Sequence, residues 1–129
     1  MDEFKRVPFK YMGRKTMVTV RVSSYLLADR LYVGVSHRIA KGLEGLLNLT
    51  INLPQYPLKY NEAFIEDQYS DDLLAFIKEN KLGTILPYTV KSKHGVHHVV
   101  AFDMDKLREF DPEDVQAHEE RYKAHVGRS

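Results

Sequence analysis

The segment 47–67, LNLTINLPQYPLKYNEAFIED, constrains the fold more than any other part of the chain. Its first seven residues alternate between apolar and polar, and the apolar positions are Leu47, Leu49, Ile51 and Leu53. A period of two residues is typical of a half-buried β-strand. The prolines at positions 54 and 57 interrupt the ladder, so we expect a long loop over residues 54–69. Loops of this length in compact domains are usually either functional or disordered.

This loop is too rich in apolar residues for disorder, and it carries Tyr56 and Tyr60. Tyrosine suits interfaces because one end of its side chain is apolar and the other can form a hydrogen bond. We expect Leu58, Phe64 and Ile65 to cover an open edge or end of the sheet. Tyr56 and Tyr60 are therefore the candidate partner-binding residues.

The rest of the chain predicts an α+β fold with one five-stranded, mainly antiparallel sheet and helices packed on one face. Strands from residue 16 and over 31–39 precede the strand at 47–53, and a hairpin turning at His94 and Gly95 follows. Ser70 and Gly83 are the expected cap signals of a helix over 70–82. A helical turn starts at Asp103, and a last helix covers 112–129.

Length and composition indicate a single domain over 1–129, with a basic irregular arm (1–14), an α+β core (15–111) and a C-terminal helix (112–129). The composition is that of an ordinary globular protein, with 43% hydrophobic and 29% charged residues. Cysteine is absent, which excludes disulfides and thiolate chemistry and fits a reducing compartment. No run of residues is long and apolar enough for a signal peptide or a membrane span, so we expect a cytoplasmic protein without membrane association.

Charge is unevenly distributed along the chain, although the net charge is only +1. Residues 1–41 carry nine Lys/Arg against three Asp/Glu, a net of +6, whereas residues 42–83 carry three against seven, a net of −4. The basic first third is an alternative functional surface that would follow a nucleic-acid backbone, with Phe9 and Tyr11 available for stacking. Its candidate residues are Lys5, Arg6, Lys10, Arg14 and Lys15.

Histidines near the hairpin are a third candidate, because clustered imidazoles often bind metal ions. The adjacent His97 and His98 point to opposite faces of a strand and His94 lies in the turn, so we expect no metal site there. We also expect the loop carboxylates Glu62, Glu66 and Asp67 to be solvated. Ser36 and His37 are strand neighbours that face opposite ways, so we expect no serine nucleophile held by a histidine, and no cofactor motif is present.

Several strings resemble a family of small uncharacterised bacterial proteins, classed as a domain of unknown function. They are LYVGV at 31–35, LTINLPQYPL at 49–58, NEAFIED at 61–67, FIKENKLG at 76–83 and AFDMDKLREFDPE at 101–113. The resemblance implies a setting in gut bacteria, often near conjugative or integrative elements, and implies no catalytic residues. We therefore expect a non-enzymatic accessory or protein-interaction protein of a bacterial mobile element. The alternatives are nucleic-acid binding by the basic first third and a metal-dependent activity at the histidine hairpin.

Overall fold

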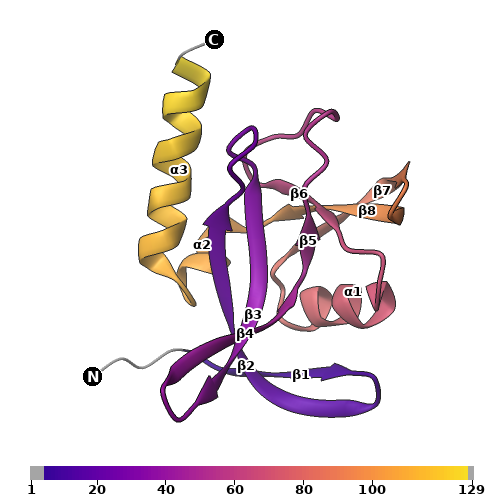
Figure 1. Cartoon of the computed structure of the whole chain (residues 1–129), viewed down its shortest axis with the longest axis vertical. Coiled ribbons are helices and arrows are strands. Elements are labelled where there is room, and N and C mark those ends of the chain that lie inside the picture. Colours follow the sequence, from indigo (N-terminus) through magenta and orange to yellow (C-terminus); the bar gives the residue numbers. More distant parts are fainter. Residues whose placement is uncertain (1–4, 128–129) are drawn as a thin grey trace.

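The computed structural model describes residues 5–127, in which two four-stranded antiparallel sheets and three helices form an α+β fold (Figure 1). The first sheet has the order β1 (Val7–Tyr11), β2 (Arg14–Ser24), β3 (Leu31–Ile39), β4 (Gly42–Asn48). The second has the order β5 (Thr50–Ile51), β6 (Glu62–Ile65), β8 (Gly95–Phe102), β7 (Gly83–Ser92). The α+β class is confirmed, and the single five-stranded sheet is wrong.

Strand β1 occupies part of the segment for which an irregular arm was expected. It pairs antiparallel with β2, and Phe9 is fully buried while its neighbours Pro8 and Lys10 are exposed. Met12 and Gly13 both have positive φ, as a two-residue type I′ hairpin turn requires. Pro8 does not prevent pairing because β1 is an edge strand, where a missing N–H group is tolerated.

Leu49 joins the two sheets at a break between β4 and β5. Its N–H donates to the carbonyl of Val33 in β3 (2.9 Å), and its carbonyl accepts from the N–H of Glu66 (3.0 Å). The segment 47–53, expected to be one strand, is therefore divided at this break. Residues 47 and 48 end β4, and residues 50 and 51 form β5. Pairing with β3 also begins earlier than expected, at Gly42.

Strand β6 lies inside the segment expected to be a loop. Ala63 and Ile65 enter the main core, whereas Phe64 faces the other side of the second sheet and packs with Leu53 and Val99. Phe64 and Ile65 thus belong to an internal strand and do not cover a sheet edge. Residues 52–61, which form the remaining loop, close over the smaller cluster around Phe64.

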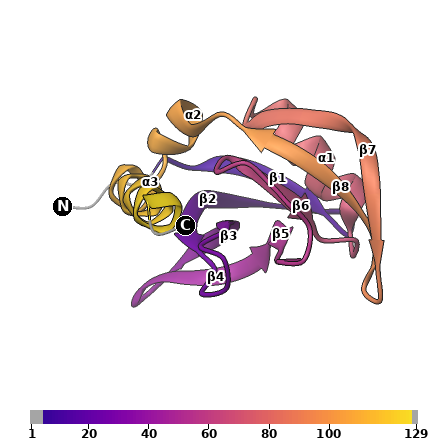
Figure 2. The ribbon, with the colours of Figure 1, turned by 90° about the horizontal axis from the view of Figure 1, so that it is seen from above.

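Helix α1 (Ser70–Glu79) packs against β1 and β7 through Leu73, Phe76 and Ile77 (Figure 2). Its caps differ from the expected ones. The N-cap is Tyr69, with φ of 62° and no side-chain cap, so Ser70 does not cap the helix. The left-handed residue after the helix is Lys81, and Gly83 already begins β7.

The β7–β8 hairpin turns at Lys93 and His94, one residue earlier than expected, because Ser92 lies opposite Gly95. Gly95 has a φ of +122°, and the Ser92 hydroxyl accepts a hydrogen bond from the His94 N–H (3.0 Å). Val90 consequently pairs with His97, whereas a turn at His94 and Gly95 would pair it with Val99.

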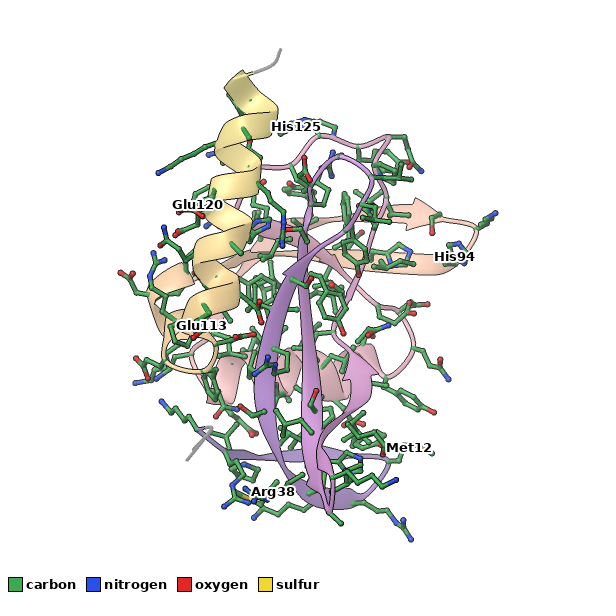
Figure 3. All side chains as sticks on the ribbon, turned by 60° about the vertical axis from the view of Figure 1, so that its left-hand side comes forward. Met12, Arg38, His94, Glu113, Glu120 and His125 are labelled. Carbon is green, nitrogen blue, oxygen red and sulfur yellow. The ribbon has the colours of Figure 1, made fainter. Side chains whose placement is uncertain are left out.

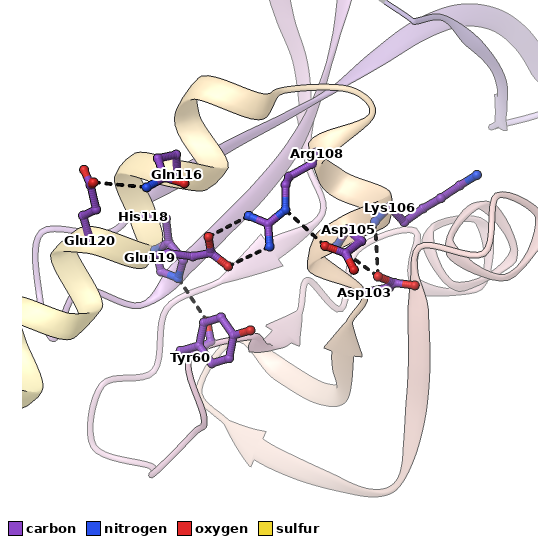
Figure 4. Close-up of polar contacts among 9 residues, drawn as sticks. All are labelled: Tyr60, Asp103, Asp105, Lys106, Arg108, Gln116, His118, Glu119 and Glu120. Carbon is purple, nitrogen blue, oxygen red and sulfur yellow. Dashed lines mark hydrogen bonds and ion pairs between the residues drawn. The ribbon is translucent and has the colours of Figure 1, made fainter.

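Helices α2 (Met104–Arg108) and α3 (Pro112–Gly127) close the fold. Asp103 caps α2 through the N–H groups of residues 105 and 106, as its position predicted. Arg108 holds α2 to α3 by a two-pronged ion pair with Glu119 (2.6 and 3.1 Å, Figure 4). Among residues 5–127, no helix has the length and apolar character needed to cross a membrane.

Helix α3 runs beside the part of β2 that β1 leaves unpaired (Figure 1). Asp111, at the start of this helix, accepts a hydrogen bond from the N–H of Val22 (2.9 Å) and lies 3.5 Å from the Arg21 guanidinium. A carboxylate thus satisfies a strand donor that would otherwise lack a partner in the sheet.

Candidate functional site

The connection between β2 and β3 is a tight loop over residues 25–30 that exposes two leucines. Its ends are joined by a hydrogen bond from the Tyr25 N–H to the Arg30 carbonyl (2.8 Å). Leu26 is 99% exposed and Leu27 is 66% exposed. The next two residues, Ala28 and Asp29, have φ of 66° and 49°, a left-handed conformation that side chains other than glycine disfavour. The fold therefore maintains a strained loop that presents apolar side chains to solvent.

Two side chains fix this loop to the neighbouring loop over residues 52–61. The Arg30 guanidinium donates to the carbonyls of Pro54 (3.3 Å) and Tyr56, and burial lowers the pKa of Arg30. The Asn52 amide donates to the Leu27 carbonyl (3.2 Å). Each loop thus has backbone carbonyls that accept hydrogen bonds from a side chain of the other loop, so the two loops are directly linked.

His118 fixes helix α3 to the same end of the molecule. Its ring is fully buried, and Nε2 lies 3.0 Å from the Tyr60 carbonyl (Figure 4). Nδ1 lies 2.7 Å from the Ser24 hydroxyl. A carbonyl only accepts, so Nε2 carries the proton; in the neutral ring Nδ1 then accepts the Ser24 proton. Burial lowers the pKa of His118, which favours this neutral form.

The contact between Ser24 and His118 resembles that of a serine hydroxyl activated by a histidine base. A second buried histidine makes the same kind of contact elsewhere in the protein. His97 is equally buried, with Nε2 at 2.7 Å from the Ser92 hydroxyl and Nδ1 at 3.0 Å from the Ile65 carbonyl. Each histidine thus joins a serine to a carbonyl of the segment 60–65. The repetition indicates two structural clamps on that segment.

Three exposed apolar side chains, Leu26, Leu27 and Tyr60, lie at this clamped end, and we call them the loop-end surface. Tyr60 is 38% exposed, and its ring lies 5.8 Å from that of Tyr122 in α3. A further contact joins His125 of α3 to Asp29 in the β2–β3 loop (3.4 Å). Figure 1 shows both loops beside the C-terminal end of α3.

The two candidate tyrosines have different surroundings. Tyr56 is partly buried in the smaller cluster, with its ring 5.9 Å from Phe64 and its hydroxyl 3.4 Å from the Lys91 carbonyl. Tyr60 presents more of its ring to solvent beside Tyr122. Only Tyr60 is placed on the loop-end surface.

The histidines of the hairpin are not brought together. His97 points into the protein, and His37 lies far along the chain in β3, 3.0 Å from Glu44. Over the described range 5–127, no three metal-ligating side chains form a group that could hold an ion. The loop carboxylates Glu62 and Glu66 accept hydrogen bonds from the backbone N–H groups of Lys59 and Asp67.

The five basic candidates lie on or next to the β1–β2 hairpin and are all exposed: Lys5, Arg6, Lys10, Arg14 and Lys15. Lys5 differs from the others because it pairs with Glu109 (2.5 Å). The aromatic residues expected to stack on bases are not available. Phe9 is fully buried, and Tyr11 is half-buried and stacked on it at 5.0 Å.

Sequence reasoning missed His118 and the two loop leucines. His118 lies three residues after Val115 and four before Tyr122, on the apolar stripe of α3, and a polar residue in such a stripe is a usable signal. Leu26 and Leu27 belong to no sequence pattern that marks them as a site.

The described residues thus form an α+β protein in which the loop-end surface is exposed and the segments that carry it are held by hydrogen bonds. A family described as Domain of unknown function (DUF4313) matches residues 19–122, so the chain belongs to this family. No curated protein and no solved structure matches the chain.

Proposed function

We propose that this protein is a non-enzymatic interaction protein that binds a protein partner through its loop-end surface. The observation that carries the proposal is the exposure of Leu26, 99%, at the tip of a strained and braced loop. Backbone strain of this kind costs about 1–3 kcal/mol per residue and is concentrated at functional positions. An accessory role in a bacterial mobile element, as the family resemblance implies, is part of the same proposal.

The hydrogen bonds that link the segments of the loop end support binding, because segments already held in place lose less conformational entropy when a partner binds. Arg30, Asn52 and His118 fix the three segments that meet there. Tyr60 adds an aromatic ring with a polar tip, the side-chain type enriched in binding hot spots. The loop leucines would supply the apolar contact and Tyr60 the edge of the interface.

A comparative pull-down tests the proposal. The bait is the full chain, and the variant is Leu26→Ser with Leu27→Ser, which removes apolar surface that is already in water. The matched control is Met12→Ser with Met17→Ser, since these methionines are also exposed (64% and 51%) but lie on the β1–β2 hairpin. Salt of about 0.3 M suppresses contacts that depend on surface charge.

We expect a protein captured by the wild type and by the methionine control, and lost with the leucine variant. Equal capture by all three baits would overturn the proposed surface. Thermal unfolding of each bait checks that the substitutions leave the fold intact, since surface changes of this type usually alter stability by less than about 0.5 kcal/mol.

A further inference from the structure

The end of the molecule opposite the loop-end surface carries a concentration of positive charge on the β1–β2 hairpin. Lys10 and Lys15 are direct cross-strand partners, and Arg14 lies opposite Tyr11 beside them. Arg6 immediately precedes β1, and all four basic side chains are exposed. We call Arg6, Lys10, Arg14 and Lys15 the basic hairpin surface.

Within residues 5–127, none of these four side chains has an ion-pair partner. Like charges directly opposite each other on neighbouring strands destabilise the pair. The nearby carboxylate of Asp72 accepts a hydrogen bond from the Met12 N–H (3.2 Å), so it is directed at the turn backbone. The hairpin thus holds two opposed lysines at a cost to its own stability, as expected where an external anion supplies the compensating charge.

A second hairpin adds charge at the same end. Arg38 and Lys41 are exposed at and beside the turn between β3 and β4. Figure 3 shows Arg38 and Met12 at one end of the molecule and His125 at the other. Glu44, the acidic residue of β4, is paired with His37.

We propose that the basic hairpin surface binds the phosphate backbone of duplex DNA without reading its sequence. Binding of single strands relies on aromatic side chains that stack on bases. Of the aromatic residues of β1, Phe9 is fully buried and Tyr11 is half-buried and stacked on it, so the hairpin offers charge without a free stacking platform. This chemistry suits a paired nucleic acid, in which the phosphates are outside and the bases are inside.

The arrangement gives the protein two ends with different chemistry. The loop-end surface is apolar, the basic hairpin surface is cationic, and β2 extends from one to the other (Figure 1). The DNA proposal does not depend on the protein partner. A protein with both activities would connect a protein to DNA.

The test is fluorescence anisotropy of a labelled 20-base-pair duplex titrated with the full chain between 50 and 200 mM KCl. Four phosphate contacts predict a slope of log affinity against log salt of about −3.6, or a loss of roughly 150-fold across this range. Lys10→Gln with Lys15→Gln should make the slope shallower by about two. Lys93→Gln with Lys123→Gln, two exposed lysines on β7–β8 and α3, should leave it unchanged.

Competition with two other polyanions tests whether the surface prefers a duplex to other anions. Under this proposal a single strand and a polyglutamate peptide of equal charge both displace the duplex poorly. Displacement by either at equal or lower concentration overturns the assignment to duplex DNA. A salt slope near zero, or equal slopes for wild type and the Lys10/Lys15 variant, overturns the site itself. Folding of the variant is checked by thermal unfolding, where loss of the opposed charges should preserve or raise stability.

Discussion

The Ser24 hydroxyl donates a hydrogen bond of 2.7 Å to Nδ1 of His118, ninety-four residues further along the chain. The other ring nitrogen donates to the Tyr60 carbonyl, so one neutral imidazole joins β2, α3 and the loop over residues 52–61. Protonation of Nδ1 would abolish its ability to accept. The clamp at the loop end therefore depends on the charge of a single ring.

This dependence predicts that acid destabilises the protein through His118. Burial lowers the folded-state pKa of His118 and outweighs the hydrogen bond to the Tyr60 carbonyl, which raises it. Arg121 lowers the pKa further, whereas the charges of Glu119 and Asp29 raise it by smaller amounts. Below about pH 6.5 the unfolded chain then binds more protons than the folded chain. The free energy of unfolding contributed by this group is fully present above pH 6.5 and is lost as pH falls through the folded pKa.

Urea unfolding of wild type and His118→Gln at pH 8, 7, 6 and 5 measures this effect. At pH 8 the substitution should cost about 1–3 kcal/mol, because buried partners lose hydrogen bonds. The difference between the two proteins should shrink at pH 5. A difference that stays constant with pH would show that His118 does not titrate in this range.

Asp111 should be needed to close the open edge of β2. Asp111→Ala leaves the buried Val22 N–H without its acceptor, and we expect a loss of about 1–3 kcal/mol. Asp111→Asn keeps an oxygen for that N–H and should cost less. Hydrogen exchange at the Val22 amide gives a local readout, and unchanged protection in Asp111→Ala would contradict the assignment.

Gly83 should tolerate no side chain. A Cβ there would lie 2.6 Å from the Ala101 carbonyl oxygen and 2.9 Å from Cα of Phe102, both backbone atoms of the paired strand and its end. Gly83→Ala should destabilise the fold by about 1–3 kcal/mol or more through overpacking. Gly45→Ala is the control, because a Cβ at Gly45 meets no atom within 4 Å. Equal midpoints in urea for both variants would be evidence against the observed β7–β8 register.

Tyr56 and Tyr60 should contribute differently to the free energy of unfolding. Tyr56→Ala removes the ring that packs on Phe64 and should cost about 2 kcal/mol, less than a fully buried aromatic side chain. Tyr60→Ala, at a more exposed ring, should cost less than about 1 kcal/mol. Similar losses for both would mean that Tyr60 is as structural as Tyr56.

Local patterns identified the regular strands well. Val18, Val20 and Val22 alternate without interruption, and all three are buried in β2. β1 was missed because Pro8 and Gly13 read as breaks, although one lies on an edge strand and the other in the hairpin turn. β6 has four residues, too few to show a period, and its partners in β8 are 35 to 39 positions away. The bend at Leu49 depends on contacts with both sheets.

The candidate site was harder to predict because its contacts join distant residues. The sequence indicated Tyr60 through composition, but the clamp at His118 forms only when β2 and α3 lie side by side. Exposure of Leu26 is also a property of the folded loop, because no local sequence pattern distinguishes a leucine that faces solvent from one that is covered. The positive charge of the first third can be counted directly from the sequence. That Lys10 and Lys15 lie opposite each other follows only from the register in which β1 pairs with β2.

Calorimetric titration of the captured partner into wild type, the Leu26/Leu27 variant and the Met12/Met17 control tests the central claim most directly. Burial of two leucine side chains at the interface, each contributing about 1 kcal/mol or more, predicts a dissociation constant raised roughly 30-fold or more for the leucine variant. The methionine control should bind like the wild type. A leucine variant that binds with the wild-type dissociation constant would contradict the assignment of the loop-end surface.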